Sequence, residues 1–159
     1  RFADYDYLHS SNHLLKEIAS KGYYSNSFHV PVDVSISSYE KIALESEFHS
    51  VCNGGCITYV EFSEMPASNT EAILDMVDYA FEKGCNYFGI NFPLDNCTTC
   101  GHISRIGEAC PRCGGHDIKR LRRVSGYLAE SDRFTPGKYK EMLQRIGHDR
   151  INSYSSEEL

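Results

Sequence analysis

Two copies of the pattern Cys-x-x-Cys-Gly lie close together in the chain, and they constrain its fold more than any other feature. Cys97 and Cys100 form the first copy, Cys110 and Cys113 form the second, and nine residues separate Cys100 from Cys110. Each copy can fold into a tight turn in which both sulfur atoms face one point, because the glycine that follows tolerates a positive φ. Four thiolates in a tetrahedron suit Zn²⁺. We therefore predict a zinc ribbon with these four cysteines as its metal ligands.

Two redox-active thiol pairs are the alternative interpretation of the same cysteines. The short spacing and the matching glycines favour the metal site, and neither pair lies at the start of a predicted helix, where reactive thiols are often found. Because the protein fills all four positions, no place remains for water or substrate, so we expect the site to be structural. It would hold a ribbon that is too small to have a stable core of its own.

The rest of the composition is that of an ordinary globular protein. The chain has 159 residues with a net charge of −6, which fits one domain, or one domain plus a small appendage, and argues against a general nucleic-acid coat. Seven cysteines without a signal-peptide pattern favour a reducing compartment, and we expect the cytoplasm. No run of about 18 apolar residues is present, so we expect no membrane span. The chain starts with Arg1, which suggests a piece of a longer protein.

Apolar periodicity predicts an α/β fold for the first part of the chain. The expected elements are helices at 8–20, at 38–47 and from Ser68 to Gly84, strands at 28–34, 57–62 and 86–92, and a last helix from Pro136 to Gly147. Ser37 with Glu40, and Ser68 with Glu71, have the spacing of capping boxes. Pro31 makes the 28–34 segment either an edge strand or an extended loop.

The strand–helix–strand order over residues 57–92 is typical of two parallel strands. Because three strands at most cannot close a barrel, we expect this region to pack against strands supplied from elsewhere. Cys52 and Cys56 flank a glycine turn and could be a thiol pair, but small buried residues at the start of a strand are the better interpretation. We expect Cys85 in the core, and His29 as a structural histidine rather than a catalyst.

A basic run follows the ribbon and leads to an isolated glycine. Four cations fall within five positions: Lys119, Arg120, Arg122 and Arg123. They form either a solvated basic face or a nucleic-acid patch beside the ribbon. Gly126 follows them in an apolar context that has no turn signal, and such a glycine usually marks a positive φ or a close approach of the backbone.

The segment Arg123–Leu128, with the sequence R-V-S-G-Y-L shortly after the ribbon, resembles the C-terminal end of the anaerobic (class III) ribonucleoside-triphosphate reductases. These are glycyl-radical enzymes. The resemblance extends over about residues 22–148 and is highly specific in its combination of ribbon, R-V-x-G-Y and flanking segments. The flanking matches are Tyr24–Val32, Gly54–Glu61, Asn91–Cys97, Gly137, Lys138, Glu141, Arg145 and His148.

The resemblance implies three parts. They are the C-terminal portion of a ten-stranded α/β barrel of the glycyl-radical enzyme type over residues 1–95, a zinc ribbon over 96–117, and a glycyl radical loop with a C-terminal helix over 118–159. Gly126 matches the radical-bearing glycine. The radical would be made by a separate activase that uses S-adenosylmethionine and an iron–sulfur cluster. It would then pass to a barrel cysteine, whose thiyl takes the 3′ hydrogen of a ribonucleoside triphosphate on the way to the deoxyribonucleotide. We expect the complete enzyme to be a homodimer.

Relative to that family, the sequence has no counterpart of the thiyl cysteine, of the ATP-binding regulatory domain or of most of the barrel, and Cys52 and Cys56 are not assigned the thiyl role. The chain alone is therefore not expected to complete a reduction, and its partners would be the rest of the reductase and the activase. The basic run becomes a candidate for docking the loop into the barrel or onto the activase. Two other functions stay open: a zinc-ribbon nucleic-acid-binding module that uses residues 119–123, and a stand-alone glycyl radical subunit that repairs a damaged reductase.

Overall fold

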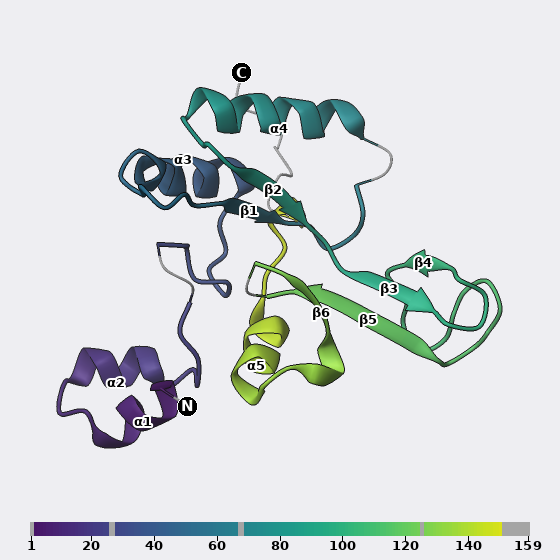
Figure 1. Ribbon diagram of the computed structural model, residues 1–159, viewed down its shortest axis with the longest axis horizontal. Helices are drawn as coiled ribbons and strands as arrows, with labels where there is room; N and C mark the ends of the chain where they lie inside the picture. The colour runs from purple at the N-terminus through teal and green to yellow at the C-terminus, as the bar shows by residue number, and fades with distance from the viewer. Residues whose placement is uncertain (1, 26–27, 67–68, 125, 151–159) are drawn as a thin grey trace, which may run out of the picture.

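The chain forms two sheets of different kinds, which a computed structural model describes over residues 2–25, 28–66, 69–124 and 126–150 (Figure 1). A two-stranded parallel sheet comes first, and a four-stranded antiparallel sheet follows it. The mixed α/β character agrees with the prediction from the sequence. Within the described ranges, no helix combines the length and the apolar character that a membrane crossing needs.

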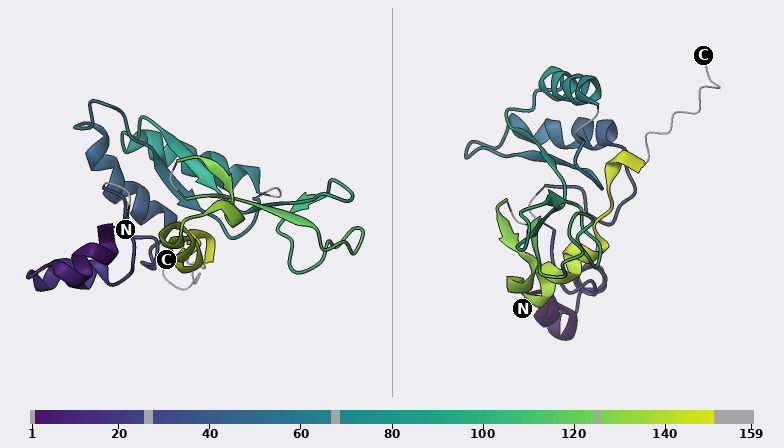
Figure 2. Two further views of the ribbon diagram at one scale, coloured as in Figure 1. Left: turned by 60° about the horizontal axis from the view of Figure 1, so that its bottom comes forward. Right: turned by 90° about the vertical axis from the view of Figure 1, so that its right-hand side faces the viewer.

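The parallel sheet is a strand–helix–strand unit. Strands β1 (Thr58–Glu61) and β2 (Phe88–Asn91) pair in parallel, with Glu61 opposite Asn91, and helix α4 (Thr70–Glu82) connects them. Helix α3 (Ser38–His49) precedes the unit and lies with α4 over the same face of the sheet (Figures 1 and 2). The prediction of parallel pairing over residues 57–92 is confirmed.

Local hydrogen bonds begin and end these helices. The Ser37 side chain accepts from the backbone N–H of Glu40, and the Glu40 side chain accepts from the backbone N–H of Ser37, so the predicted capping box is present. Asn69 caps α4 by accepting from the backbone N–H of Ala72, while Ser68, the predicted cap, lies outside the described residues. The helix is followed by Gly84 with φ +88°, as the sequence predicts.

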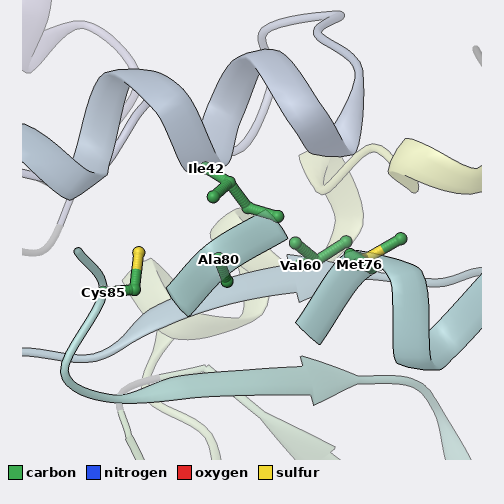
Figure 3. Packing of buried hydrophobic residues seen from close by; sticks show 5 residues of the cluster. All are labelled: Ile42, Val60, Met76, Ala80 and Cys85. Carbon is green, nitrogen blue, oxygen red and sulfur yellow. The ribbon is translucent and has the colours of Figure 1, made fainter. Parts of the chain in front are cut away.

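The hydrophobic core lies between the helices and the sheet. Ile42 of α3 and Val60 of β1 are fully buried, and they pack with Met76 and Ala80 of α4 and with Cys85 (Figure 3). Because side chains alternate along a strand, the neighbours of Val60 on β1 point to the opposite face of the sheet. That face carries the polar residues of the site described below.

The antiparallel sheet has the strand order β4–β3–β5–β6. Its strands are β3 (Leu94–Cys97), β4 (Ile103–Ser104), β5 (Ile118–Arg123) and β6 (Leu128–Glu130). β3 follows β2 after two residues, so the two sheets are directly connected (Figure 1). A 3₁₀ turn η1 (Ser131–Arg133), helix α5 (Pro136–Gln144) and a second 3₁₀ turn η2 (His148–Arg150) complete the described chain.

The N-terminal part differs from the prediction in two places. The helix expected at 8–20 is two helices, α1 (Phe2–His9) and α2 (His13–Ala19), because Asn12 caps the second by accepting from the backbone N–H of Leu15. Residues 28–34, all described, form turns and an irregular loop rather than a strand. The N–H of Val30 donates to the Glu45 side chain instead of to a neighbouring strand, which agrees with the loop alternative.

Truncation of Ile42 tests the position of the core. Ile42→Ala removes a fully buried side chain and leaves a cavity, so the free energy of unfolding should fall by about 3 kcal/mol. Leu44→Ala on the exposed side of the same helix should change it by less than about 0.5 kcal/mol. Urea denaturation measures both values, and equal losses in the two variants would contradict this core.

Candidate functional site

The four predicted metal ligands come together at the outer end of the antiparallel sheet. Cys97 ends β3, Cys100 lies in the turn that follows, and Cys110 and Cys113 lie in the turn before β5. Their sulfur atoms are all within 4.8 Å of one another. The Sγ atoms of Cys97 and Cys113 are 3.6 Å apart, and those of Cys100 and Cys110 are 3.7 Å apart. This group could hold one metal ion.

The same backbone turn shapes both cysteine pairs. The N–H of Gly101 donates to the carbonyl of Cys97, and the N–H of Gly114 donates to the carbonyl of Cys110, each at 2.8 Å. Gly101 has φ +70° and Gly114 has φ +71°, a conformation that favours glycine at both positions. The predicted pair of matching turns is therefore present.

The four thiols influence one another's ionisation. Burial opposes ionisation of the Cys97 thiol, but the backbone N–H of Cys100 and the thiol of Cys113 donate to its sulfur and lower its pKa to about 6. The N–H of Gly115 favours the thiolate of Cys113, but the adjacent sulfurs of Cys100 and Cys97 raise the pKa of Cys113 to about 12. Because like charges so close together repel, the full set of thiolates needs a cation between them.

A buried carboxylate joins the ribbon to the basic run. Asp95 on β3 is completely buried, and its two oxygens accept from Arg122 Nη1 at 2.6 Å and from Arg120 Nη1 at 3.3 Å. The N–H of Ile106 also donates to Asp95, at 2.8 Å. Lys119 pairs with Glu130 at 3.4 Å. Each of these cations therefore has an acidic partner within the protein, which disfavours the nucleic-acid interpretation of the run.

The last cation of the run, Arg123, contacts the parallel sheet. Its Nη1 donates to the hydroxyl of Tyr59 at 2.5 Å, and its guanidinium lies 4.8 Å from the centre of the Tyr59 ring. Tyr59 pairs with Gly89 across the sheet, and a Cβ on Gly89 would lie 2.8 Å from Tyr59 Cε1. Gly89 thus leaves room for the ring, and the ring fixes the end of β5 against β1.

Gly126 lies between β5 and β6, and we call the described residues there, Val124, Gly126 and Tyr127, the β5–β6 loop. Its φ of +80° is in the region that favours glycine, as the sequence predicts. A Cβ at this position would meet no atom within 4 Å, so the backbone angle and not crowding favours glycine here. The residue is exposed, and it opens onto a cavity of about 270 Å³.

The cavity lies on the polar face of the parallel sheet, opposite the hydrophobic core. Its polar lining comprises Ser25, His29, Lys41, Tyr59, Glu61, Asn91, Arg123, Glu141, Arg145 and His148, and its apolar lining comprises Val30, Val32, Ile57 and Val124. Three parts of the chain therefore surround this cavity: the β5–β6 loop, the ends of β1 and β2, and the segment from α5 onward.

A network of ionised and amide side chains forms one wall of the cavity. Glu61 accepts from Arg145 Nη1 and, at 2.6 Å, from Asn91 Nδ2, and Arg145 Nη2 donates to Glu141 at 2.8 Å. Burial raises the pKa of Glu61 and of Glu141, although Arg145 acts in the opposite direction on each. Two buried carboxylates thus bind the single guanidinium of Arg145.

The segment after α5 also accepts hydrogen bonds from the backbone at the end of β1 and just beyond it. His148 Nδ1 accepts from the N–H of Glu61 at 2.9 Å, and Asp149 Oδ2 accepts from the N–H and the hydroxyl of Ser63 at 2.9 and 2.5 Å. Burial, with the nearby cation of Lys41 as a second cause, lowers the pKa of His148 to about 4. The imidazole is therefore neutral at pH 7, as an acceptor at Nδ1 requires.

Reasoning from the sequence did not assign a role to Glu61, Asn91, Arg145 or His148. All four fall in segments that carry the family resemblance, and the available signal was a polar residue at the end of an otherwise apolar strand, as in Val60-Glu61 and Ile90-Asn91. Such a signal marks a candidate position but does not identify its partner.

Five further residues stand out in the sequence: His29, Cys52, Cys56, Cys85, and Asn26 within the matching segment Tyr24–Val32. His29 Nδ1 lies 3.1 Å from Glu45 Oε2 at the cavity, and Asn26 lies outside the described residues. Cys85 is in the core as predicted, whereas Cys52 and Cys56 are half-buried rather than core residues. Burial and then the neighbouring Cys52 thiol raise the pKa of Cys56, so it is not an activated nucleophile.

The pH dependence of stability tests the neutral, buried His148. Between its ordinary pKa of 6.5 in the unfolded chain and about 4 in the folded protein, the unfolded state binds a proton that the folded state does not. Stability should therefore fall by about 2 kcal/mol between pH 7.5 and pH 5 from this group. His148→Asn keeps an acceptor but cannot titrate, so denaturant unfolding should show a smaller loss. Equal losses in both proteins would contradict the assignment.

Comparisons with known proteins agree on one family. The sequence profile of the anaerobic ribonucleoside-triphosphate reductases matches residues 1–148. The chain is 38% identical over 144 residues to the enzyme of that name from Enterobacteria phage T4, covering 84% of this chain and 24% of that protein. It is 38% identical over 141 residues to the enzyme of that name from Escherichia coli, covering 82% of this chain and 20% of that protein. The chain therefore spans about a quarter or less of the length of these relatives.

Solved structures give the same result. An anaerobic ribonucleotide reductase matches 83% of this chain and 22% of its own length, with a TM-score of 0.64 and 25% identity. The anaerobic ribonucleotide reductase from Thermotoga maritima in complex with dATP and CTP matches 82% of this chain and 20% of its own length, with a TM-score of 0.62 and 25% identity.

Proposed function

Because the chain belongs to the anaerobic ribonucleoside-triphosphate reductase family, we propose that it supplies the radical-bearing C-terminal part of such a reductase. Joined to the rest of the barrel, it would take part in the conversion of ribonucleoside triphosphates to deoxyribonucleoside triphosphates. The other parts of the reductase and the activase are its proposed partners, and the complete enzyme is proposed to be a homodimer.

The position of Gly126 is the observation that carries this proposal. The glycine lies in the β5–β6 loop with φ +80° and lines the cavity at the ends of β1 and β2. An α-carbon radical is planar, and it is stabilised by donation from the amide nitrogen on one side and withdrawal by the carbonyl on the other. A residue without a Cβ reaches that planar state most easily, and the open space around Gly126 leaves its Cα accessible.

The proposed radical relay moves hydrogen atoms. The activase, with S-adenosylmethionine and its iron–sulfur cluster, removes one hydrogen atom from the Cα of Gly126. The Gly126 radical then takes a hydrogen atom from a cysteine thiol in the remainder of the barrel, and the resulting thiyl takes the 3′ hydrogen of the substrate. The 2′-hydroxyl would take up a proton and leave as water, an external reductant would supply two electrons with a second proton for the 2′ carbon, and the cysteine would return the 3′ hydrogen, which restores the thiyl.

We propose zinc as the metal of the four-cysteine group. Zn²⁺ bound to four thiolates at about 2.3 Å places the sulfurs about 3.8 Å apart, and the Sγ distances of 3.6 and 3.7 Å in the ribbon are close to this value. Cys97, Cys100, Cys110 and Cys113 would fill every position, so the ion would hold the ribbon together and take no part in the reaction. Its place at one end of β5 would fix the strand whose other end carries the loop.

The parallel sheet fits the proposed barrel. One of its faces is covered by α3 and α4, and the other is polar and faces the cavity, as expected for strands of a barrel with helices outside. We propose that the other strands of a ten-stranded barrel come from the remainder of the reductase. Residues 1–95 would belong to the barrel, 96–117 to the ribbon, and 118–159 to the radical loop and the C-terminal helix.

Metal removal tests the proposed zinc ribbon. The chain should contain one equivalent of zinc, and a strong chelator should unfold residues 96–117, because the only apolar residues packed around the sulfurs are Ile106 and Ile118 in the described part of the chain. Hydrogen exchange should rise there by at least about 100-fold and stay low in α3 and β1. A ribbon that keeps its protection without metal would contradict the proposal.

Substitution of Gly126 tests the proposed function. After activation together with the rest of the reductase, the wild-type protein should give an oxygen-sensitive doublet in electron paramagnetic resonance, and Gly126→Ala should give none while keeping its zinc. Gly84→Ala is the matched control, because Gly84 also has a positive φ, +88°, and open space at its Cβ position. A doublet that survives Gly126→Ala would refute the assignment.

A further inference from the structure

The start of the β5–β6 loop is held through two backbone carbonyls. Asn91 Nδ2 donates to the carbonyl of Arg123 at 3.3 Å, and Arg145 Nη2 donates to the carbonyl of Val124 at 3.5 Å. These carbonyls precede Gly126 by three and two residues. The chain entering the loop is therefore bound both to the end of β2 and to the segment that follows α5.

One carboxylate orients both donors. The NH₂ group of Asn91 has two hydrogens, and its nitrogen is within bonding distance of Glu61 Oε2, at 2.6 Å, and of the Arg123 carbonyl. Arg145 likewise donates from Nη1 to Glu61 Oε1 and from Nη2 to the carbonyl of Val124. Glu61 itself is 8% exposed, so water competes little for its oxygens.

Among the described residues of the loop, side-chain packing does not fix the glycine. The space around the Cβ position of Gly126 is open, and Tyr127 is 56% exposed. After Gly126, the hydroxyl of Tyr127 accepts from Lys138 Nζ of α5 at 2.5 Å, and this contact is exposed. The partly buried contacts to the Arg123 and Val124 carbonyls are thus better shielded from water than this exposed one.

We propose that Glu61 is a positioning residue for Gly126. By holding Asn91 and Arg145 together, its carboxylate fixes the carbonyls of Arg123 and Val124 and so determines where the Cα of Gly126 faces the cavity. The proposal rests on the proposed function in one respect only: the position of the Gly126 Cα matters to the reaction because this atom would carry the radical. The hydrogen-bond geometry can be tested without any radical.

Glu61→Gln is the direct test. Glutamine has the same shape, but an NH₂ group replaces one of the two oxygens, which face Arg145 and Asn91 separately, so one of these two donors then faces another donor. In the zinc-loaded chain, hydrogen exchange at the amides of Val124, Gly126 and Tyr127 should rise about ten-fold, while exchange in α3 and the ribbon stays within two-fold of wild type. Asn91→Ala removes the donor to the Arg123 carbonyl and one donor to Glu61, but it leaves Arg145 on Glu61 and on the Val124 carbonyl, so it should give a smaller rise at the same amides.

Glu141→Gln is the matched control. Glu141 is a second buried carboxylate on the same guanidinium, and the oxygen of glutamine can keep its hydrogen bond with Arg145 Nη2. In the described part of the chain, no hydrogen bond joins the Glu141 side chain to a loop carbonyl or to Asn91. Its variant should leave loop exchange within two-fold of wild type. The proposal is overturned if Glu61→Gln leaves the loop amides unchanged, if Glu141→Gln raises them equally, or if exchange rises throughout the chain. If Glu61→Gln does not fold, an unchanged loop in Asn91→Ala overturns it.

A second readout separates this proposal from the proposed function. With activase and the rest of the reductase present, Glu61→Gln should lower the yield of the glycyl radical at least about five-fold at unchanged zinc content, and Gly84→Ala, which lies outside the site, should not. A wild-type protein without any radical would refute the proposed function, and the exchange data would still decide the role of Glu61. A normal radical yield in Glu61→Gln would overturn the positioning role.

Discussion

The ion pair between Glu61 and Arg145 is the interaction on which the arrangement of the cavity depends. It joins the end of β1 to the segment after α5, and the two residues lie 84 positions apart in the chain. Burying a carboxylate and a guanidinium costs desolvation free energy, and apolar residues of similar size could occupy the same space at less cost. We therefore interpret the pair as an interaction that fixes geometry. Arg145 donates to the carbonyl of Val124, and Glu61 accepts from Asn91, which in turn donates to the carbonyl of Arg123.

Strand β5 links the metal group to the loop. It follows Cys113 at one end and leads through Arg123 into the β5–β6 loop at the other (Figure 1). Between these ends, Arg120 and Arg122 hold the buried carboxylate of Asp95 on β3, so the strand is fixed along its length. The arginines that looked like a binding surface in the sequence therefore hold β5 to β3. A rigid strand with a fixed base is a simple way to hold an exposed glycine at a defined place.

Short-range signals in the sequence predicted much of this structure. The cysteine turns, the Ser37 capping box and the parallel strand pair each depend on residues close together in the chain, and each is present. The network around Glu61 could not be predicted in the same way, because a polar residue at a strand end does not reveal a partner 84 positions away. Residues 28–34, predicted as either an edge strand or an extended loop, are a loop for a similar reason: the Glu45 side chain, on another element, accepts from the N–H of Val30.

The mass of the fragments formed on exposure to air is the most direct test of the central claim. If Gly126 carries the radical, oxygen should react at its Cα and cut the activated chain there, which yields an N-terminal fragment that ends at the Gly126 site and a complementary C-terminal fragment. Both masses can be read in one spectrum. An activated chain that stays intact in air, or that is cut at another residue, would contradict the account.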